Sequence, residues 1–173
     1  IGTSIIGQTD NICPIDREMY KIRDVTATID SFPLMASSIL SKKIAEGIDK
    51  LVMDVKTGNG AFLKTNKEAK EFSQIINRIC SSFDIKSQCA ITNMNQPLGE
   101  CSGLANEVQE CINIMRGNTS NDTKKLTFIL AERCLENTGI DKCSKDFENL
   151  IESGHVFEKF EEMVSAHGGS LEK

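Results

Sequence analysis

The sequence predicts an α/β fold with a partial parallel sheet flanked by helices. Lys50–Lys56 is a short apolar run typical of a buried strand, and Lys86–Asn93, with Cys89-Ala90-Ile91 at its centre, is predicted as the next strand. Between them, Asn66–Ser82 repeats apolar side chains every three or four positions, which is typical of an amphipathic helix. A strand, a helix and a second strand in this order predict a right-handed crossover between parallel strands.

The amino-terminal part is predicted to add one strand and two helices. Gly2–Gln8 holds a Ser-Ile-Ile run between glycines, which favours a short buried strand. Ile15–Arg23 carries acidic residues early and basic residues late, which suits a short helix and its dipole. Ser31–Glu46 has apolar side chains at helical spacing, with Pro33 in its first turn and Gly47 as its stop.

The carboxyl-terminal part is predicted to be helical throughout. Its expected helices are Ser102–Met115, Thr123–Asn137, Cys143–Glu152 and Phe157–His167. The first of them carries the apolar residues Leu104, Val108, Cys111 and Ile112. No change of composition marks a domain boundary along the chain.

The composition is that of a soluble globular protein and disfavours two classes of partner. Of 173 residues, 39% are hydrophobic and 26% charged, and the net charge is −5. Basic residues are not clustered, Trp is absent and Tyr occurs once, so we expect no nucleic-acid binding. No apolar run has the length of a membrane span, and no basic region precedes the short amino-terminal apolar run. We therefore expect a cytoplasmic protein without a membrane partner.

The cysteines favour a reducing compartment. Their number is odd, they are scattered, and no two of them form a Cys-x-x-Cys pair. We expect free, mostly buried thiols rather than disulfides or a metal cluster. They are Cys13, Cys80, Cys89, Cys101, Cys111, Cys134 and Cys143.

A candidate recognition site is formed by Arg23, Ser38 and Lys42. Ser38 and Lys42 are four residues apart and share one face of the predicted helix, and Arg23 could point back at that face. Arg and Lys only donate hydrogen bonds, whereas a Ser hydroxyl also accepts. The set therefore complements the carbonyl, N–H and carbonyl edge of uracil or thymine. Taken alone, three such residues are more often solvated surface groups, so their spacing does not by itself identify a site.

Four stretches of the sequence resemble the pyrimidine-nucleoside and thymidine phosphorylase family. They are IIGQT at Ile5–Thr9, the segment Ile22–Gly47, MDVKTGNGAF at Met53–Phe62 and TNMNQPLG at Thr92–Gly99. The resemblance runs in one order along almost the whole chain. In that family an Arg, the second Ser of an SS pair and the first Lys of a KK pair hold the pyrimidine. By position these are Arg23, Ser38 and Lys42.

The resemblance also implies a domain division and a longer protein. Residues 1–14 and 47–173 would be part of the α/β domain, and residues 15–46 a segment of a separate helical domain across a cleft. Members of the family are more than twice as long, and their phosphate-binding residues precede the segment that matches here. Because the first residue is Ile rather than Met, we expect a fragment with the base-binding half of the site.

The ligands that the resemblance implies are a pyrimidine nucleoside and phosphate, both as substrates, and no organic cofactor. Some members of the family also hold a cation, potassium or calcium, near the hinge between the domains. By position, its ligands would be the backbone carbonyls of Leu98 and Cys101 and the carboxylate of Glu110. The resemblance also implies that the whole protein is a homodimer.

The implied activity is reversible phosphorolysis of thymidine or uridine to a free base and a pentose 1-phosphate. As the glycosidic bond breaks, negative charge spreads to the ring oxygens, where Arg23 and Lys42 would stabilise it while Ser38 orients the ring. Two alternatives stay open. One is a structural or interaction fragment without turnover, or a degenerate homologue. The other is a transferase acting on phosphoribosyl anthranilate, against which the IRDVTATIDS and SSILSKK segments argue.

Overall fold

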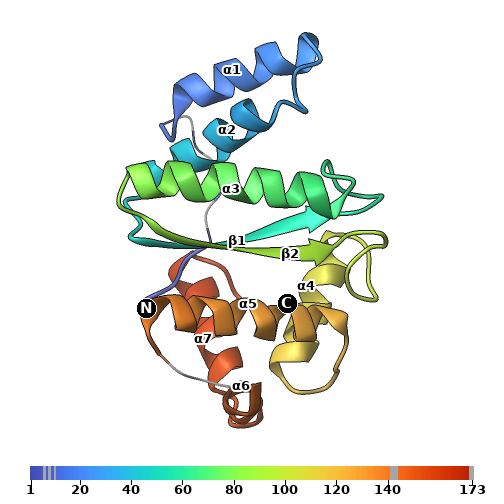
Figure 1. The fold of residues 1–173 in the computed structure, drawn as a ribbon. Helices are drawn as coiled ribbons and strands as arrows, with labels where there is room; N and C mark the ends of the chain where they lie inside the picture. Colours follow the sequence, from blue (N-terminus) through green and yellow to red (C-terminus); the bar gives the residue numbers. More distant parts are fainter. Residues whose placement is uncertain (6, 8, 10, 141–143, 172–173) are drawn as a thin grey trace. The chain divides into compact units, whose positions relative to one another are not determined.

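The computed structural model describes every residue except 6, 8, 10, 141–143 and 172–173. The described residues form seven helices and one parallel sheet of two strands, shown in Figure 1. This arrangement confirms the predicted α/β class. None of the described helices is both long enough and apolar enough to span a bilayer.

The chain divides into two compact units. One consists of Gln8–Pro97 and Arg133–Ile140, and the other of Ile1–Gly7, Leu98–Glu132 and Asp141–Lys173. The predicted assignment of residues 15–46 to a separate helical domain stays a prediction.

A β–α–β arrangement lies at the centre of the unit that contains residues 8–97. β1 (Lys50–Thr57) and β2 (Lys86–Asn93) pair in parallel along their whole length. α3 (Asn66–Ser82) connects them and lies along the sheet in Figure 1. A capping box fixes its start, because Thr65 Oγ1 accepts from the Glu68 N–H at 3.2 Å while the Glu68 carboxylate accepts from the Thr65 N–H at 2.8 Å. The predicted strand–helix–strand order with parallel strands is confirmed, and the right-handed sense of the crossover stays a prediction.

Apolar side chains of these elements form the core of this unit, and α2 (Phe32–Ala45) completes it. Phe72 and Ile76 of α3 are at most 3% exposed. Leu40 of α2 joins the same core, and the Phe32 ring meets the Phe72 ring edge-on with centroids 6.0 Å apart. α2 is therefore held against α3 by its own apolar side, which leaves its other sides for polar groups.

α1 (Pro14–Val25) precedes α2, and both confirm predicted helices. The strand predicted at Gly2–Gln8 is wrong. The described residues of that stretch form no strand, Gly2 has a φ of +86° and Ile5 is 72% exposed. A strand is stable only where its backbone groups find a partner, and the sheet among the described residues contains β1 and β2 without a third strand.

Four helices follow β2, as predicted. They are α4 (Leu104–Met115), α5 (Asp122–Thr138), α6 (Ser144–Glu152) and α7 (His155–Ala166). Residue 143, where the third of these was expected to begin, lies outside the described residues. Within the unit that contains Leu98–Glu132, the rings of Phe128 and Phe147 pack with centroids 5.3 Å apart, and Ile151 and Met163 are buried.

The buried side of α4 is not the one that carries most of its apolar residues. Leu104 is 90% exposed and Val108 50% exposed, whereas Glu110 and Ile114 are buried. The physical reason is that a carboxylate can be buried when hydrogen-bond donors surround it, and the loop before α4 supplies such donors to Glu110. Hydropathy alone cannot anticipate this.

The described cysteines are free thiols, as predicted, but the expectation that most are buried is wrong. Cys80 is buried, while Cys101, Cys111 and Cys134 are exposed. Cys111 is exposed because α4 turns the side that carries Glu110 and Ile114 inward instead. The seventh cysteine, Cys143, lies outside the described residues.

Candidate functional site

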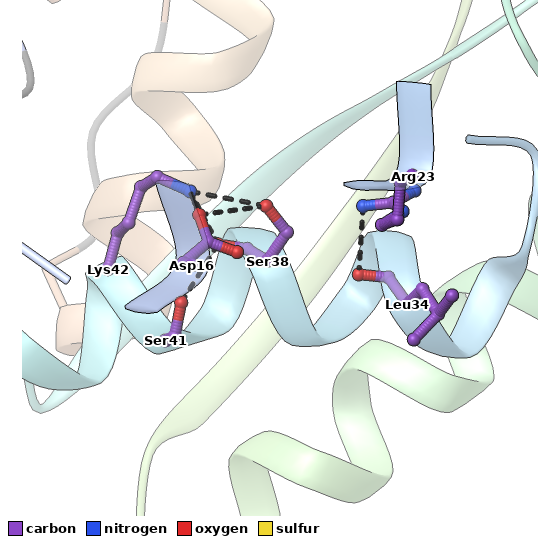
Figure 2. Close-up of polar contacts among 6 residues, drawn as sticks. All are labelled: Asp16, Arg23, Leu34, Ser38, Ser41 and Lys42. Carbon is purple, nitrogen blue, oxygen red and sulfur yellow. Dashed lines mark hydrogen bonds and ion pairs between the residues drawn. The ribbon is translucent and has the colours of Figure 1, made fainter. Parts of the chain in front are cut away.

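An acidic side chain of α1 joins two of the predicted site residues on α2. The Asp16 carboxylate accepts a hydrogen bond from the Ser38 hydroxyl at 3.1 Å and pairs with the Lys42 ammonium at 2.5 Å, both through Oδ2. Lys42 Nζ also donates to the carbonyl oxygen of Ser38 at 2.7 Å and to Ser38 Oγ at 3.3 Å. Figure 2 shows these three side chains directed at one another. We call Asp16, Ser38 and Lys42 the polar cluster.

The position of this cluster follows from the two helices that carry it. α2 buries Ala36 and Leu40, so Ser38 and Lys42 fall on a different side of the helix. Asp16 lies in the first turn of α1. The side chains of Asp16 and Lys42 are 13% and 26% exposed, so water screens this ion pair less than it screens a surface pair. The cluster is thus a partly buried, charge-assisted network.

Arg23, the third predicted site residue, is directed elsewhere. Its guanidinium donates to the carbonyl oxygens of Thr28 at 3.4 Å, Ile29 at 2.5 Å and Leu34 at 3.3 Å, and the residue is 6% exposed. Figure 2 shows it at Leu34, which precedes Ser38 by four positions on α2. Four positions correspond to a rise of about 6 Å, or one helical turn. The structure therefore brings Ser38 and Lys42 together and leaves Arg23 one turn away.

An apolar cavity of about 330 Å³ lies beside the same helix. Met35 and Ile39 of α2 line it, together with Phe62 and Met94 from the segments that follow β1 and β2. Met35, Ser38, Ile39 and Lys42 follow one another at helical spacing, so their side chains leave neighbouring parts of one side of α2. Ser38 and Lys42 do not line the cavity themselves but lie beside its lining residues along α2. Polar groups beside an apolar hollow suit a flat heterocycle with one polar edge.

A second, polar cavity of about 420 Å³ lies at the carboxyl ends of β1 and β2. Thr57, Lys64, Asn93 and Asn95 contribute to its lining. The Asn95 amide donates to Asn93 Oδ1 at 2.7 Å, whereas the buried Thr57 Oγ1 makes no hydrogen bond within the described structure. Ligands in open α/β sheets bind at the carboxyl ends of the strands, so the location is one where a polar substrate group could be held.

Comparison with known proteins assigns the domain that carries these sites. The family described as "Glycosyl transferase family, a/b domain" matches residues 1–155. The chain belongs to this family. The family membership that the four sequence stretches indicated is thus confirmed for the glycosyl transferase family. The α/β class of that family's domain agrees with the observed fold.

Individual relatives of this glycosyl transferase domain carry more specific names. "Thymidine phosphorylase" of Colwellia psychrerythraea is 44% identical over 174 residues, covering 98% of this chain and 40% of the relative. "Pyrimidine-nucleoside phosphorylase" of Bacillus subtilis and that of Staphylococcus epidermidis are each 38% identical over 170 residues, covering 96% of this chain and 39% of the relative. The chain thus spans about two fifths of the length of these relatives.

Glu110, a predicted cation ligand of the glycosyl transferase domain, lies among hydrogen-bond donors. Its carboxylate accepts from the N–H of Cys101 at 2.9 Å, the N–H of Glu100 at 3.1 Å, the Asn121 amide at 2.5 Å and the Thr123 hydroxyl at 3.2 Å. Burial raises the pKa of the Glu110 carboxyl, but these hydrogen bonds outweigh it, so its pKa lies below the ordinary value.

As arranged, these residues do not fit a cation. A carboxylate has about four lone-pair sites, and four donor groups already address Glu110. The loop presents its N–H groups at Glu100 and Cys101 to the carboxylate, whereas a cation shared with Glu110 would need the loop's carbonyl oxygens. The carbonyls of Leu98 and Cys101 stay predicted ligands only, and no step of the chemistry below depends on a cation.

Asp16 is the functional candidate that the sequence did not reveal. In the sequence it is one of two acids, with Glu18, in the first half of a helix, where the dipole alone accounts for it. Its partner Ser38 lies 22 positions further along, and no spacing rule connects residues on two helices of unknown crossing. The sequence offered only an indirect signal for Asp16. Ser38 and Lys42 lie together on a helix that packs against neighbours, and the Lys42 ammonium, where it is partly buried, needs an anion as partner.

Proposed function

We propose that the intact protein that contains this chain catalyses reversible phosphorolysis of pyrimidine nucleosides, with Arg23, Ser38 and Lys42 holding the base. The reaction would convert thymidine or uridine and phosphate to the free base and a pentose 1-phosphate. The observation that carries this proposal is the polar cluster beside the apolar cavity on α2, in a chain 44% identical to a protein named thymidine phosphorylase.

Lys42 would contribute most to the chemistry. Breaking the glycosidic bond leaves its electron pair on the pyrimidine, whose negative charge spreads to the ring oxygens. An ammonium group at one of these oxygens stabilises the transition state more than the neutral ground state, which accelerates the reaction. Of its three present partners, Ser38 Oγ at 3.3 Å is the most distant and would be the one exchanged for the ring oxygen.

Arg23 would serve the second ring oxygen, but only after a local rearrangement. Its three present acceptors are backbone carbonyls, and a guanidinium carries five N–H donors. Exchange of the Leu34 carbonyl for the substrate would let Arg23 keep two of its contacts. Phosphate, as second substrate, requires groups that the resemblance places outside this chain. We also propose a cytoplasmic homodimer that acts in nucleoside salvage, by analogy with the family.

The test is phosphorolysis by the intact purified protein. Uridine, thymidine and cytidine are each incubated with and without phosphate, and the free base and pentose 1-phosphate are quantified. We expect phosphate-dependent release of uracil or thymine in equal amount to the sugar phosphate. If no pyrimidine nucleoside is cleaved in a phosphate-dependent manner, the proposal fails and a role without turnover is favoured.

A further inference from the structure

The Ser38 hydroxyl uses its single proton in a hydrogen bond to Asp16. A carboxylate can only accept, so the 3.1 Å contact between Ser38 Oγ and Asp16 Oδ2 has the hydroxyl as its donor. The contact is sheltered, because the Asp16 side chain is 13% exposed. Water is thus poorly placed to replace Ser38 as a donor to this carboxylate oxygen. The direction of the hydroxyl is set by its neighbour rather than left to rotate.

With its proton committed, Ser38 can offer a ligand only a lone pair. A hydroxyl oxygen has two acceptor positions, and one of them receives the Lys42 ammonium at 3.3 Å. The remaining one can accept a hydrogen bond from a ring N–H. It cannot satisfy a ring nitrogen that itself presents a lone pair. The network therefore gives Ser38 a defined polarity before any ligand arrives.

We propose that Asp16 is a specificity-determining residue that makes the site select pyrimidines whose ring nitrogen N3 carries a proton. This inference rests on the proposed function, in which Ser38 faces that nitrogen. Uracil and thymine present N3–H to the free lone pair of Ser38. Cytosine presents an unprotonated N3, so Ser38 has to turn its proton away from Asp16 to bind it. Asp16 does not touch the substrate and acts through Ser38.

Binding of cytosine would leave the Asp16 carboxylate without its Ser38 donor. Turning the Ser38 proton towards cytosine removes a hydrogen bond from a carboxylate that is mostly sheltered from water. A hydrogen bond to a charged acceptor contributes more than one between neutral groups, and a partner left unpaired costs its full desolvation. With cytosine bound, Lys42 still pairs with Asp16. The lost hydrogen bond therefore weakens the binding of cytosine without breaking the ion pair.

A purely structural role for Asp16 is the competing explanation, because the ion pair with Lys42 also joins α1 to α2. The two roles differ in what a substitution changes. Loss of a structural contact lowers the activity towards every base to the same extent. If Ser38 no longer holds its proton towards Asp16, the ratio of kcat/KM between uridine and cytidine changes. Loss of a purely structural contact would leave this ratio unchanged.

The experiment compares kcat/KM for uridine and cytidine in the intact protein and its Asp16→Asn variant. Asparagine has nearly the same shape, but its amide can donate to Ser38 as well as accept, which frees the hydroxyl to point either way. We expect the preference for uridine over cytidine to fall about tenfold to a hundredfold, the value of one hydrogen bond to a charged group. Where cytidine turnover is below detection, inhibition constants of free uracil and cytosine compare how tightly the two bases bind, and their ratio should fall in the same direction.

Two further variants act as controls. Asp16→Glu retains an anionic acceptor and is expected to restore much of the preference. Glu18→Gln removes a charge from the same helix at an exposed position that pairs with Lys21, and is expected to leave the preference unchanged. An Asp16→Asn protein that loses activity towards both nucleosides equally, with the ratio intact, overturns the proposal.

The remaining measurements distinguish an effect on folding from an effect on base selection. Thermal unfolding is recorded for each variant, and if Asp16→Asn does not fold, the ratio is measured in Ser38→Ala instead. That variant lacks the hydroxyl, so an unchanged ratio would show that Ser38 does not read N3, and the proposal would fall. Failure of the proposed function has a different signature, because the unmodified protein would then cleave no pyrimidine nucleoside at all.

Discussion

The guanidinium of Arg23 donates a hydrogen bond to the carbonyl oxygen of Ile29, with Nη2 and the oxygen 2.5 Å apart. Two further bonds, to the carbonyls of Thr28 and Leu34, make Arg23 a connection between the end of α1 and the start of α2. The residue is 6% exposed, so its guanidinium has little access to water as an alternative partner. Arg23 thus stabilises the turn that positions Ser38 and Lys42.

Replacing Arg23 with Met should therefore lower the stability of the protein. Methionine retains a long apolar stem but removes the guanidinium from three carbonyl groups, of which that of Thr28 keeps the Ser31 N–H as a donor at 3.4 Å. We expect this loss to cost roughly 1–3 kcal/mol. The free energy of unfolding is measured by urea denaturation. Arg78→Met, at an exposed position of α3, serves as the control and should change it little. Equal stability of the two variants would contradict the role assigned to the Arg23 bonds.

Gly58, directly after β1, should tolerate no side chain. Its φ is +128°, and a Cβ atom there would lie 2.6 Å from Asn95 Oδ1. Gly58→Ala should lower the free energy of unfolding by about 1–3 kcal/mol, since it adds this clash to backbone strain. Gly47→Ala is the control, because Gly47 has a φ of +70° with open space around it. A substitution there adds backbone strain from the positive φ without a clash. A larger loss at Gly47 than at Gly58 would contradict this account.

Much of the fold could be predicted because local signals agree with long-range packing. α3 and β2 begin and end at the predicted residues. In α3, the capping box at Thr65 and the apolar repeat both indicate the same helix. The stretch Gly2–Gln8 has the local pattern of a strand, yet pairing is a long-range property that the pattern does not contain. α4 begins at Leu104 rather than Ser102 because Gly103, with a φ of +108°, breaks the helix there.

The candidate site was predictable only where residues share one helix. The four-residue spacing of Ser38 and Lys42 puts them together in any helix, and the structure agrees. Asp16 and the backbone partners of Arg23 depend on how α1 crosses α2, which spacing does not determine. Glu110 was predicted as a cation ligand by resemblance, but its environment of N–H donors emerges only from the folded loop.

Glu110→Gln should destabilise the protein near neutral pH, and the loss should fade in acid. The folded carboxyl has a lowered pKa, because its hydrogen bonds outweigh the opposing effect of burial. Its stabilising contribution is therefore complete above the ordinary glutamate pKa and is lost as the pH falls through the lower folded value. Thermal unfolding between pH 3 and pH 7 measures it. We expect a lower Tm for Glu110→Gln at pH 7, and curves that converge at the acidic end.

The matched control for this experiment is Glu161→Gln, at an exposed position of α7. It removes the same charge without removing a carboxylate that loop N–H groups address. Its Tm should follow that of the unmodified protein across the pH range. A Glu110→Gln curve parallel to the unmodified one at every pH would show that the ionisation of Glu110 contributes nothing to folding.

Lys42→Ala should lower the turnover of the intact protein more than it weakens substrate binding. The ammonium group is expected to interact with the leaving base most strongly once negative charge has developed on it. A charged hydrogen bond is worth about 1.5–3 kcal/mol, so we expect kcat to fall about tenfold to a hundredfold or more. Steady-state kinetics with uridine or thymidine at saturating phosphate separate kcat from KM.

The neighbouring residue provides the control for this prediction. Lys43 lies on the same helix, is more exposed and pairs with Glu46 at 3.0 Å, so Lys43→Ala removes an equal charge outside the polar cluster. Its kcat should stay close to that of the unmodified protein. Because Lys42→Ala also leaves Asp16 without its cation, thermal unfolding is recorded alongside. A folded Lys42→Ala protein with normal kcat and a raised KM would show that Lys42 binds the substrate and transition state equally, and does not stabilise the leaving group.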